Sequence, residues 1–202
     1  MNENTIHNDN SRPQAEVPQG GYRPKLTMYH PNNRGSGSAA QFALHPAHDS
    51  TDGSIMMQIA NQKTVGCAGG SSPFSTFDWQ NSIGVKLDFT DLTRMLQVFR
   101  GECEAIEGEY GLIHRSPSGT TIIQLKHQLE PIPGYALSVK RKKNDGTEVR
   151  SFLLLSNNEA LGLSEAIAGS LSVICFGIPK VIPHDTSAYQ AATKGMRNVA
   201  AA

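Results

Sequence analysis

The sequence contains few cysteines and no long apolar run. Its three cysteines, Cys67, Cys103 and Cys175, are widely spaced and form no C-x-x-C pattern. This spacing excludes the common zinc and dithiol redox motifs and favours reduced thiols in the cytosol. The first twenty residues hold neither the apolar core of a secretory signal nor an arginine-rich amphipathic start. The most apolar segment, residues 166–178, is too short to span a bilayer. We therefore expect a soluble, cytoplasmic protein with no membrane partner.

Motifs of enzyme active sites are also missing. The sequence has no nucleophile elbow, no glycine-rich phosphate-binding loop and no pair of carboxylates with glycosidase character. The segment HPAHDSTD does gather potential metal ligands in His45, His48, Asp49 and Asp52. Its proline and its Asp-Gly pair equally suit a turn between two strands. We therefore expect no metal, no cofactor and no enzymatic activity, and we keep a metal-dependent enzyme at these four residues as an alternative.

Net charge is absent overall, but the charges are unevenly placed. Lys and Arg number 18, as do Asp and Glu, so the formal net charge is zero. Residues 86–109 contain three basic and six acidic side chains, whereas residues 110–155 contain seven basic and three acidic ones. Such a separation is typical of proteins that bind a polyanion. A solvated basic surface without a partner gives the same pattern.

Apolar periodicity divides the chain into two similar halves. In the first half, alternating segments are followed by Leu92, Met95, Leu96 and Phe99, which form the i, i+3, i+4, i+7 stripe of an amphipathic helix. The second half repeats four strands and one helix. We expect strands at 25–30, 39–45, 54–63 and 82–89 before a helix at 91–100, and strands at 109–115, 120–129, 134–143 and 147–155 before a helix at 157–176.

Capping residues mark the expected helix ends. Thr90 suits the N-cap of the first helix, and Gly101 follows its last turn. Ser156 and Glu159 form a capping box for the second. The two strand-to-helix junctions, KLDFTDLTRML and FLLLSNNEALG, align with an offset of 66 residues. The sequence therefore predicts an α+β fold of two ββββα repeats, whose antiparallel sheets pack together with the helices on one side.

The two ends differ in composition from this core. Residues 1–21 are polar and rich in Asn, Gln and Pro, which predicts a flexible arm. Residues 178–202 are interpreted as a peripheral tail. The folded domain is expected to span 22–177, with repeat one at about 22–104 and repeat two at about 105–177.

The order of several segments resembles the Whirly family. These segments are GSGSAAQFALHP, GSIMMQIANQ, FDWQNSIGVKLDFTDLTRML, YALSVKRK and FLLLSNNEALGLSEAIAGSLSVICFG. The resemblance covers roughly 25–177 and implies single-stranded DNA binding by a homotetramer of chains with two ββββα units each. The same unit serves eukaryotic transcriptional coactivators and mitochondrial RNA-binding proteins. In the family, lysines occupy the small-residue run before the second strand, whereas Ser36 and Ser38 stand in those places here.

The stretch YALSVKRKKNDGTEVRSFLLL predicts a basic β-hairpin. If Asp145 and Gly146 form a two-residue turn, Arg141 lies directly opposite Arg150, with Val139 opposite Phe152. Two opposed arginines repel each other unless an anion lies between them, and a phosphate would fit there. A three-residue loop that shifts the register is the alternative, and so are arginines that point into water.

These observations lead to a functional hypothesis. We expect a non-enzymatic, largely sequence-independent single-stranded DNA-binding protein of a prokaryote or phage, nucleoid-associated, acting in replication, recombination, repair or transcription. An RNA-binding protein of the same fold and a protein-interaction scaffold are the alternatives. Single strands are bound by basic side chains along the backbone and by aromatic faces under the bases. The expected binding residues are Arg23, Lys25, Arg34, Lys126, Lys140, Arg141, Lys142, Arg150, Trp79 and Tyr135.

Overall fold

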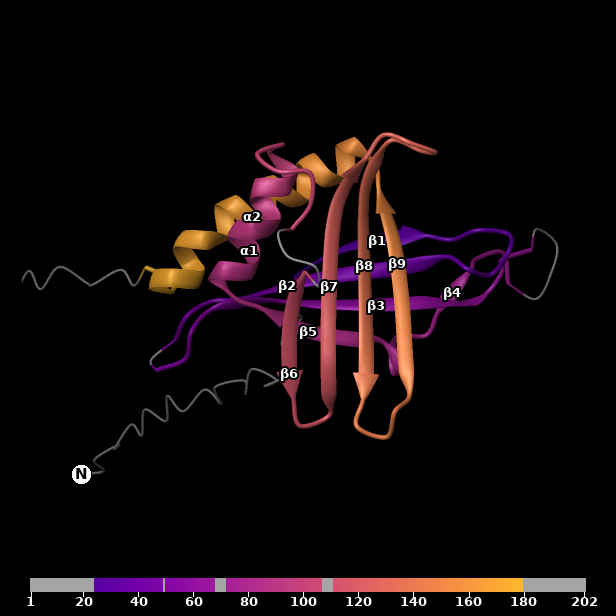
Figure 1. Ribbon diagram of the computed structural model, residues 1–202, viewed down its shortest axis with the longest axis horizontal. Coiled ribbons are helices and arrows are strands. Elements are labelled where there is room, and N and C mark those ends of the chain that lie inside the picture. The colour runs from indigo at the N-terminus through magenta and orange to yellow at the C-terminus, as the bar shows by residue number, and fades with distance from the viewer. Residues whose placement is uncertain (1–23, 49, 68–71, 107–110, 180–202) are drawn as a thin grey trace, which may run out of the picture.

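The computed structural model describes residues 24–48, 50–67, 72–106 and 111–179 (Figure 1). The proposed arm at 1–21 and nearly all of the proposed tail lie outside these residues. The elements follow one another as β1 (Lys25–His30), β2 (Ser38–His45), β3 (Ser54–Thr64), β4 (Thr76–Phe77), the short helix η1 (Trp79–Asn81), β5 (Ile83–Leu87), α1 (Phe89–Phe99), β6 (Leu112–Ser116), β7 (Gly119–Gln128), β8 (Gly134–Lys143), β9 (Glu148–Leu155) and α2 (Asn157–Phe176).

Two antiparallel sheets account for the α+β fold that the sequence predicted. Sheet one has the order β1-β2-β3-β4, and β5 also pairs with β3. Sheet two has the order β6-β7-β8-β9. The strands of the two sheets cross in Figure 1, with α1 and α2 side by side at one end of the crossing. The two-residue strand β4 and η1 lie within the long connection between β3 and β5, where the sequence predicted no element.

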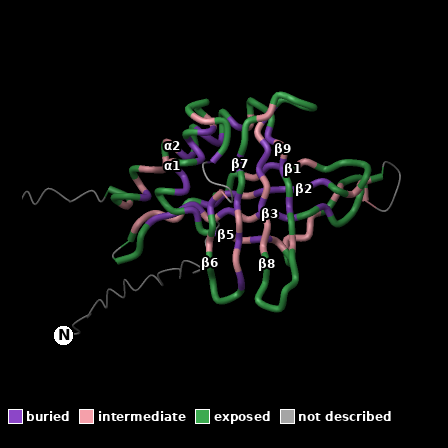
Figure 2. The backbone as a smooth tube through the Cα atoms, in the orientation of Figure 1, coloured by how far each residue is buried: buried purple, intermediate pink, exposed green. Residues whose placement is uncertain are grey.

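The core lies between the crossed sheets. Met57 and Ile59 of β3 belong to one cluster with Ile123 of β7 and Leu137 of β8, and all four are fully buried. Because side chains alternate across a strand, the residues between them point to the outer face of each sheet. Figure 2 shows buried positions where the sheets cross and exposed positions along the hairpin ends. The core therefore fixes which side chains of each strand can meet a partner.

Each long helix begins at a capping box. The Asp88 carboxylate accepts from the Asp91 N–H and starts α1, two residues before the predicted cap at Thr90. Ser156 and Glu159 start α2 as predicted. The two N-caps, Asp88 and Ser156, are 68 residues apart. The offset of 66 predicted from the sequence was therefore wrong by two residues, although the repeat itself is present.

At each helix N-terminus, a histidine from one half of the chain contacts a carboxylate from the other half. His30 of β1 in the first half contacts Glu159 of α2, with 2.8 Å between Nε2 and Oε1. His114 of β6 in the second half lies beside Asp91 of α1, with 3.2 Å between Nε2 and Oδ2. Burial raises the pKa of Asp91, even though the Asp88 N–H and His114 act in the opposite direction. Each half thus places a histidine against the capping carboxylate of the other half.

Helix α2 is apolar on sides that this chain leaves uncovered. Leu163 and Ile167 are buried in the core, whereas Leu161 and Phe176 are 62% and 87% exposed. By length and composition α2 alone, among the described residues, could cross a membrane, and 28% of its most apolar window is buried. It is longer than the 166–178 segment judged too short from the sequence. An apolar groove of about 350 Å³ lies beside it, lined in part by Leu26, Phe42, Leu163 and Ile167.

Candidate nucleic-acid interface

The β8–β9 hairpin has a three-residue loop, and the predicted two-residue turn was wrong. The Lys143 N–H donates to Thr147 O (2.8 Å), and the Gly146 N–H donates to Lys143 O (3.0 Å). Gly146 has a φ of 86°, a conformation that suits glycine and ends such a loop. The Asp145 side chain accepts from the Thr147 N–H at 2.8 Å and holds the loop closed. Lys140, not Arg141, therefore lies opposite Arg150.

The shift by one residue places Arg141 and Arg150 on opposite faces of sheet two. Arg141 faces sheet one, where its Nε donates to Thr121 Oγ1 and its Nη2 donates to Gly84 O, both at 2.9 Å. Gly84 belongs to β5, so this guanidinium joins the two sheets. The proposed phosphate site between two opposed arginines is thus absent from the hairpin.

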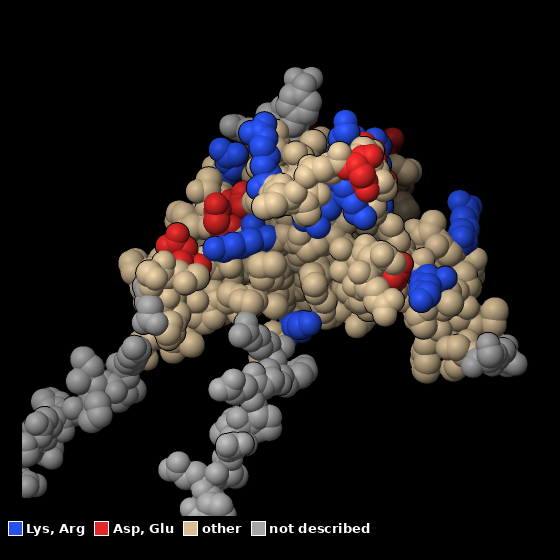
Figure 3. Space-filling view, turned by 90° about the horizontal axis from the view of Figure 1, so that it is seen from below, with Lys and Arg blue, Asp and Glu red and all other residues tan. Residues whose placement is uncertain are grey.

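The basic side chains that do gather lie on the outer face of sheet two. The cross-strand partners set Arg115 near Lys142, and Lys140 beside Arg150. We call this surface the basic face, and it consists of Arg115, Lys126, Lys140, Lys142 and Arg150 with one carboxylate, Glu148. Figure 3 looks onto the hairpin ends and shows Lys and Arg in several groups with fewer acids between them. Arg115 was counted in the basic segment 110–155 but was not among the expected binding residues.

Glu148 organises the centre of the basic face. Its carboxylate accepts from Lys140 Nζ at 2.7 Å and from Arg150 Nε at 2.6 Å. These bonds from Lys140 and from Arg150 lower the pKa of Glu148, so the carboxylate stays ionised at neutral pH. The two cations are held side by side at the surface, and each has further N–H donors that these two bonds do not use. Five basic side chains against one acid still leave this face positive.

A hollow of about 260 Å³ opens between two rows of side chains on the basic face. It is lined by Ile122, Gln124, Ser138, Lys140 and Arg150. Phe152 follows Arg150 on the same face of β9, is paired with Ser138, and is 54% exposed. The sequence interpretation missed this aromatic ring because the predicted register placed it opposite Val139, a core residue.

The remaining predicted site residues do not join the basic face. Lys25 is exposed in β1, and Arg34 is exposed in the loop between β1 and β2. Trp79 is half-buried in η1. Tyr135 is half-buried too, and its hydroxyl donates to Phe99 O at 3.3 Å, which ties α1 to sheet two. Arg23 lies outside the described residues.

A pair of aromatic rings lies on the outer face of sheet one. The rings of Tyr29 and Phe77 are 5.6 Å apart between centroids. In the sheet, Ala39 and Ala60 are the successive cross-strand neighbours of Tyr29, and both are buried. The small alanines leave room for the two rings to meet above them. Of the basic residues on this face, Lys25 and Lys86 are both exposed.

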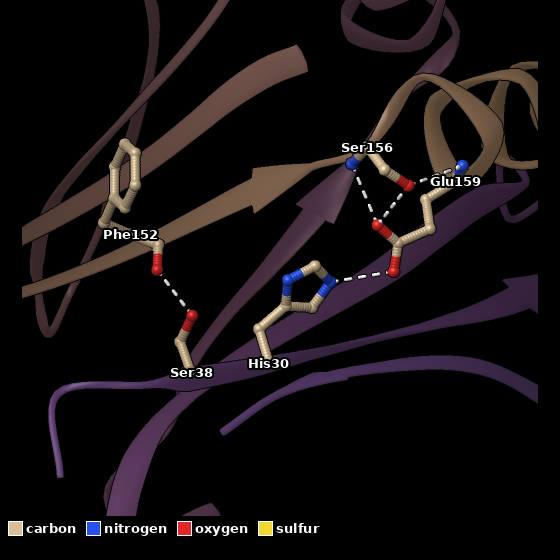
Figure 4. Close-up of polar contacts among 5 residues, drawn as sticks. All are labelled: His30, Ser38, Phe152, Ser156 and Glu159. Carbon is tan, nitrogen blue, oxygen red and sulfur yellow. Dashed lines mark hydrogen bonds and ion pairs between the residues drawn. The ribbon is translucent and has the colours of Figure 1, made fainter. Parts of the chain in front are cut away.

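Polar side chains of sheet one hydrogen-bond to backbone carbonyls of β9, the edge strand of sheet two (Figure 4). The Ser38 hydroxyl donates to Phe152 O, and Asn61 Nδ2 donates to Arg150 O at 3.0 Å. Near Ser38, His30 reaches Glu159, which also accepts from Ser156. Ser38 is buried. Ser38 therefore joins the two sheets, and the carbonyls of Arg150 and Phe152 at the edge of β9 are occupied by side chains of sheet one.

The possible metal ligands lie in the connection between β2 and β3. His48 and Thr51 form an isolated bridge there, as expected for a turn. Asp49 lies outside the described residues. No group of three or more His, Cys, Asp or Glu that could hold a metal was found among the residues that the structure describes. The absence of a bound metal stays a prediction.

Glutamine at position 159 should remove a pH-dependent part of the stability. Burial alone would raise the pKa of Glu159, but hydrogen bonds from the Ser156 N–H and hydroxyl and from His30 together lower it below its ordinary value of 4.5. Such a carboxyl stabilises the fold above its unfolded pKa, and this stabilisation is lost as the pH falls through its folded pKa. Glutamine can still complete a capping box. We expect the wild type to exceed Glu159→Gln in unfolding free energy at neutral pH and to approach it in acid.

Urea unfolding at a series of pH values measures this difference. Glu102→Gln, an exposed carboxyl after α1, serves as the control and should show no such convergence. A difference between wild type and Glu159→Gln that stays constant from neutral to acid pH would contradict the prediction.

Comparisons with known proteins add to this geometry. No protein-family model matches the chain, and no curated protein matches it by sequence. Among solved structures, WHY3 from Arabidopsis thaliana matches with a TM-score of 0.57 at 12% identity, over 88% of this chain and 98% of that one. WHY1 from the same plant gives 0.56 at 12%, over 77% and 93%. The plant transcriptional regulator PBF-2 gives 0.55 at 12%, over 87% and 97%. At these identities the likeness establishes the fold alone.

Proposed function

We propose that this chain, whose fold is Whirly-like, is a non-enzymatic nucleic-acid-binding protein that holds a single strand on the basic face of sheet two. The observation that carries the proposal is the cluster of five basic side chains on one sheet face, with Lys140 and Arg150 held side by side by Glu148. A row of cations matches a phosphate backbone, and the exposed ring of Phe152 among them offers a face for a base.

Single-stranded DNA is the proposed ligand, and RNA is the alternative. The resemblance in the sequence favours DNA, and the plant regulator of similar fold is described as a transcriptional one. The surface itself supports a single strand over a duplex, because Phe152 can stack only on a base that is not enclosed in a helix. Binding should then be largely sequence-independent, in the cytoplasm of a prokaryote or a phage-infected cell, and serve replication, recombination, repair or transcription.

Assembly is part of the same proposal. Helix α2 exposes Leu161 and Phe176, and an apolar groove lies beside the helix. Exposed apolar surface of this kind often marks a protein–protein interface. We propose that copies of the chain associate through α2, as a homotetramer by resemblance. Four basic faces in one particle would raise the affinity for a long strand by multivalency.

Replacing Lys140 and Arg150 by glutamine should flatten the salt dependence of binding. On single strands, log affinity falls with log salt by about 0.7 per phosphate neutralised. Loss of two contacts should therefore reduce the slope by about 1.4 per chain and weaken all sequences alike, because phosphate contacts carry no base information. Fluorescence anisotropy with a labelled single strand at several salt concentrations measures both quantities.

The matched control is Lys25→Gln/Lys86→Gln, which removes the same charge from the outer face of sheet one. It should leave the slope unchanged. A slope that changes in the control variant and not in Lys140→Gln/Arg150→Gln would place the interface on sheet one and overturn the proposal. Duplex DNA and RNA of the same length, tested in parallel, decide between the ligands.

A further inference from the structure

The hollow on the basic face has a neutral, polar centre. Gln124 of β7 and Ser138 of β8 are cross-strand partners, and their side chains point outward between the basic rows. Neither side chain hydrogen-bonds to another residue in the described part of the chain. On the outer face of sheet one the comparable pair, Gln41 and Gln58, is closed, because Gln41 Nε2 donates to Gln58 Oε1. The donors and acceptors of Gln124 and Ser138 are therefore open to a ligand.

The dimensions and lining of the hollow suit a nucleobase. Ile122 supplies an apolar wall, and the small side chain of Ser138 leaves the space open at about 260 Å³. Phe152 stands next to Ser138 in the same cross-strand row and presents its ring to the same surface. An amide offers one donor and one acceptor side by side, which matches the paired groups on the edge of a base.

We propose that this hollow is a base-reading subsite for one unstacked base of the bound strand. Phe152 stacks on the base, the Gln124 amide and the Ser138 hydroxyl hydrogen-bond its edge, and Lys140 and Arg150 hold the flanking phosphates. The inference rests on the proposed binding of single strands to the basic face. Its consequence is a measurable preference among bases, superimposed on binding that is otherwise sequence-tolerant.

Three labelled homopolymers of equal length, dA, dC and dT, test the subsite with the full chain. Fluorescence anisotropy should give wild-type affinities that differ by about 5-fold or more between the tightest and weakest strand, the effect of one or two hydrogen bonds. In Gln124→Ala/Ser138→Ala the spread should fall below about 2-fold, while the salt slope is unchanged. Phe152→Leu should weaken all three strands by about 5-fold or more, since stacking accepts any base.

The matched control is Gln41→Ala/Gln58→Ala, which truncates the closed pair on sheet one and should leave the spread as in the wild type. Equal wild-type affinities for the three strands, or a spread that survives in Gln124→Ala/Ser138→Ala, would overturn the subsite. In that case the salt-slope result for Lys140→Gln/Arg150→Gln still stands as support for the proposed function. A wild type that binds none of the strands defeats the proposed function, and the subsite with it.

Discussion

Replacing Arg141 by methionine should lower the free energy of unfolding by roughly 2–3 kcal/mol and leave the salt slope of strand binding unchanged. The guanidinium donates to Thr121 Oγ1 in sheet two and to Gly84 O in sheet one, and Thr121 is fully buried. Methionine fills most of the same space but leaves both acceptors without their charged donor. An unpaired buried acceptor carries its desolvation cost into the folded state. Urea unfolding measures the stability, and anisotropy measures the slope.

Arg150→Met is the control, because it is the same substitution on the same hairpin, on the outer face. Its side chain is 71% exposed and is bonded to Glu148, so we expect little change in stability and a flatter salt slope. Thr121→Val alone and together with Arg141→Met completes a double-mutant cycle, in which contacting residues should be non-additive. If Arg141→Met flattened the slope and left stability unchanged, the residue would belong to the binding surface and not to the joint between the sheets.

The different roles of Arg141 and Arg150 depend on strand register, which the sequence did not determine, whereas the bounds of several elements could be predicted. The strands at 25–30 and 134–143 and the helix at 157–176 were predicted at their observed bounds. Those elements follow from alternation and from a capping box, which are local patterns. Strand register depends on the loop, and the hairpin sequence allows loops of two or three residues. The structure has three, because the Lys143 N–H pairs with Thr147 O across the loop and Asn144 Nδ2 donates to Pro117 O in the neighbouring turn.

The same limit applies to α1. Both Asp88 and Thr90 are good capping residues, and the sequence interpretation chose Thr90. Asp88 is the N-cap because Asp91, three residues later, bonds back to the Asp88 N–H and completes the box. Asp88 and Asp91 have the spacing of a capping box in the sequence, whereas Thr90 is followed three residues later by Thr93, which cannot complete one.

The sequence predicted a basic surface in the second half of the chain, but not every residue that shares this surface. An excess of basic residues in 110–155 indicated a polyanion surface, and Lys126, Lys140, Lys142 and Arg150 do share one face. It was harder to predict which aromatic residues are exposed for binding, because a sheet protein also needs aromatic residues for packing. Tyr135 packs against the partly buried Phe99 and bonds to its carbonyl. Phe152, which the wrong register placed in the core, is exposed.

The exposed side of α2 also carries two glycines, which would let another helix approach it closely. Between the exposed Leu161 and Phe176, the outward positions include Gly162 and Gly169, where an added Cβ would meet no atom within 4 Å. Small side chains on a helix let another helix approach closely and gain packing contacts along its length. A second copy of α2 packed against this side would bury Leu161 and Phe176, which lie near the two ends of the helix.

Arginine at position 169 should therefore convert the assembled protein into monomers. Within one chain the substitution meets open space and replaces a poor helix former, so the isolated fold should be unaffected or gain up to about 1 kcal/mol. Between closely packed helices the same side chain brings bulk and, even with Glu165 four residues earlier as its partner, a charge from each copy that must lose its water. Light scattering on a size-exclusion column at micromolar concentration measures the mass, and circular dichroism confirms the fold. Asn33→Arg, in the exposed loop between β1 and β2, adds the same residue away from α2 and should keep the wild-type mass. A monomeric wild type, or a Gly169→Arg variant with the mass of the wild-type assembly, would show that α2 is not the assembly surface.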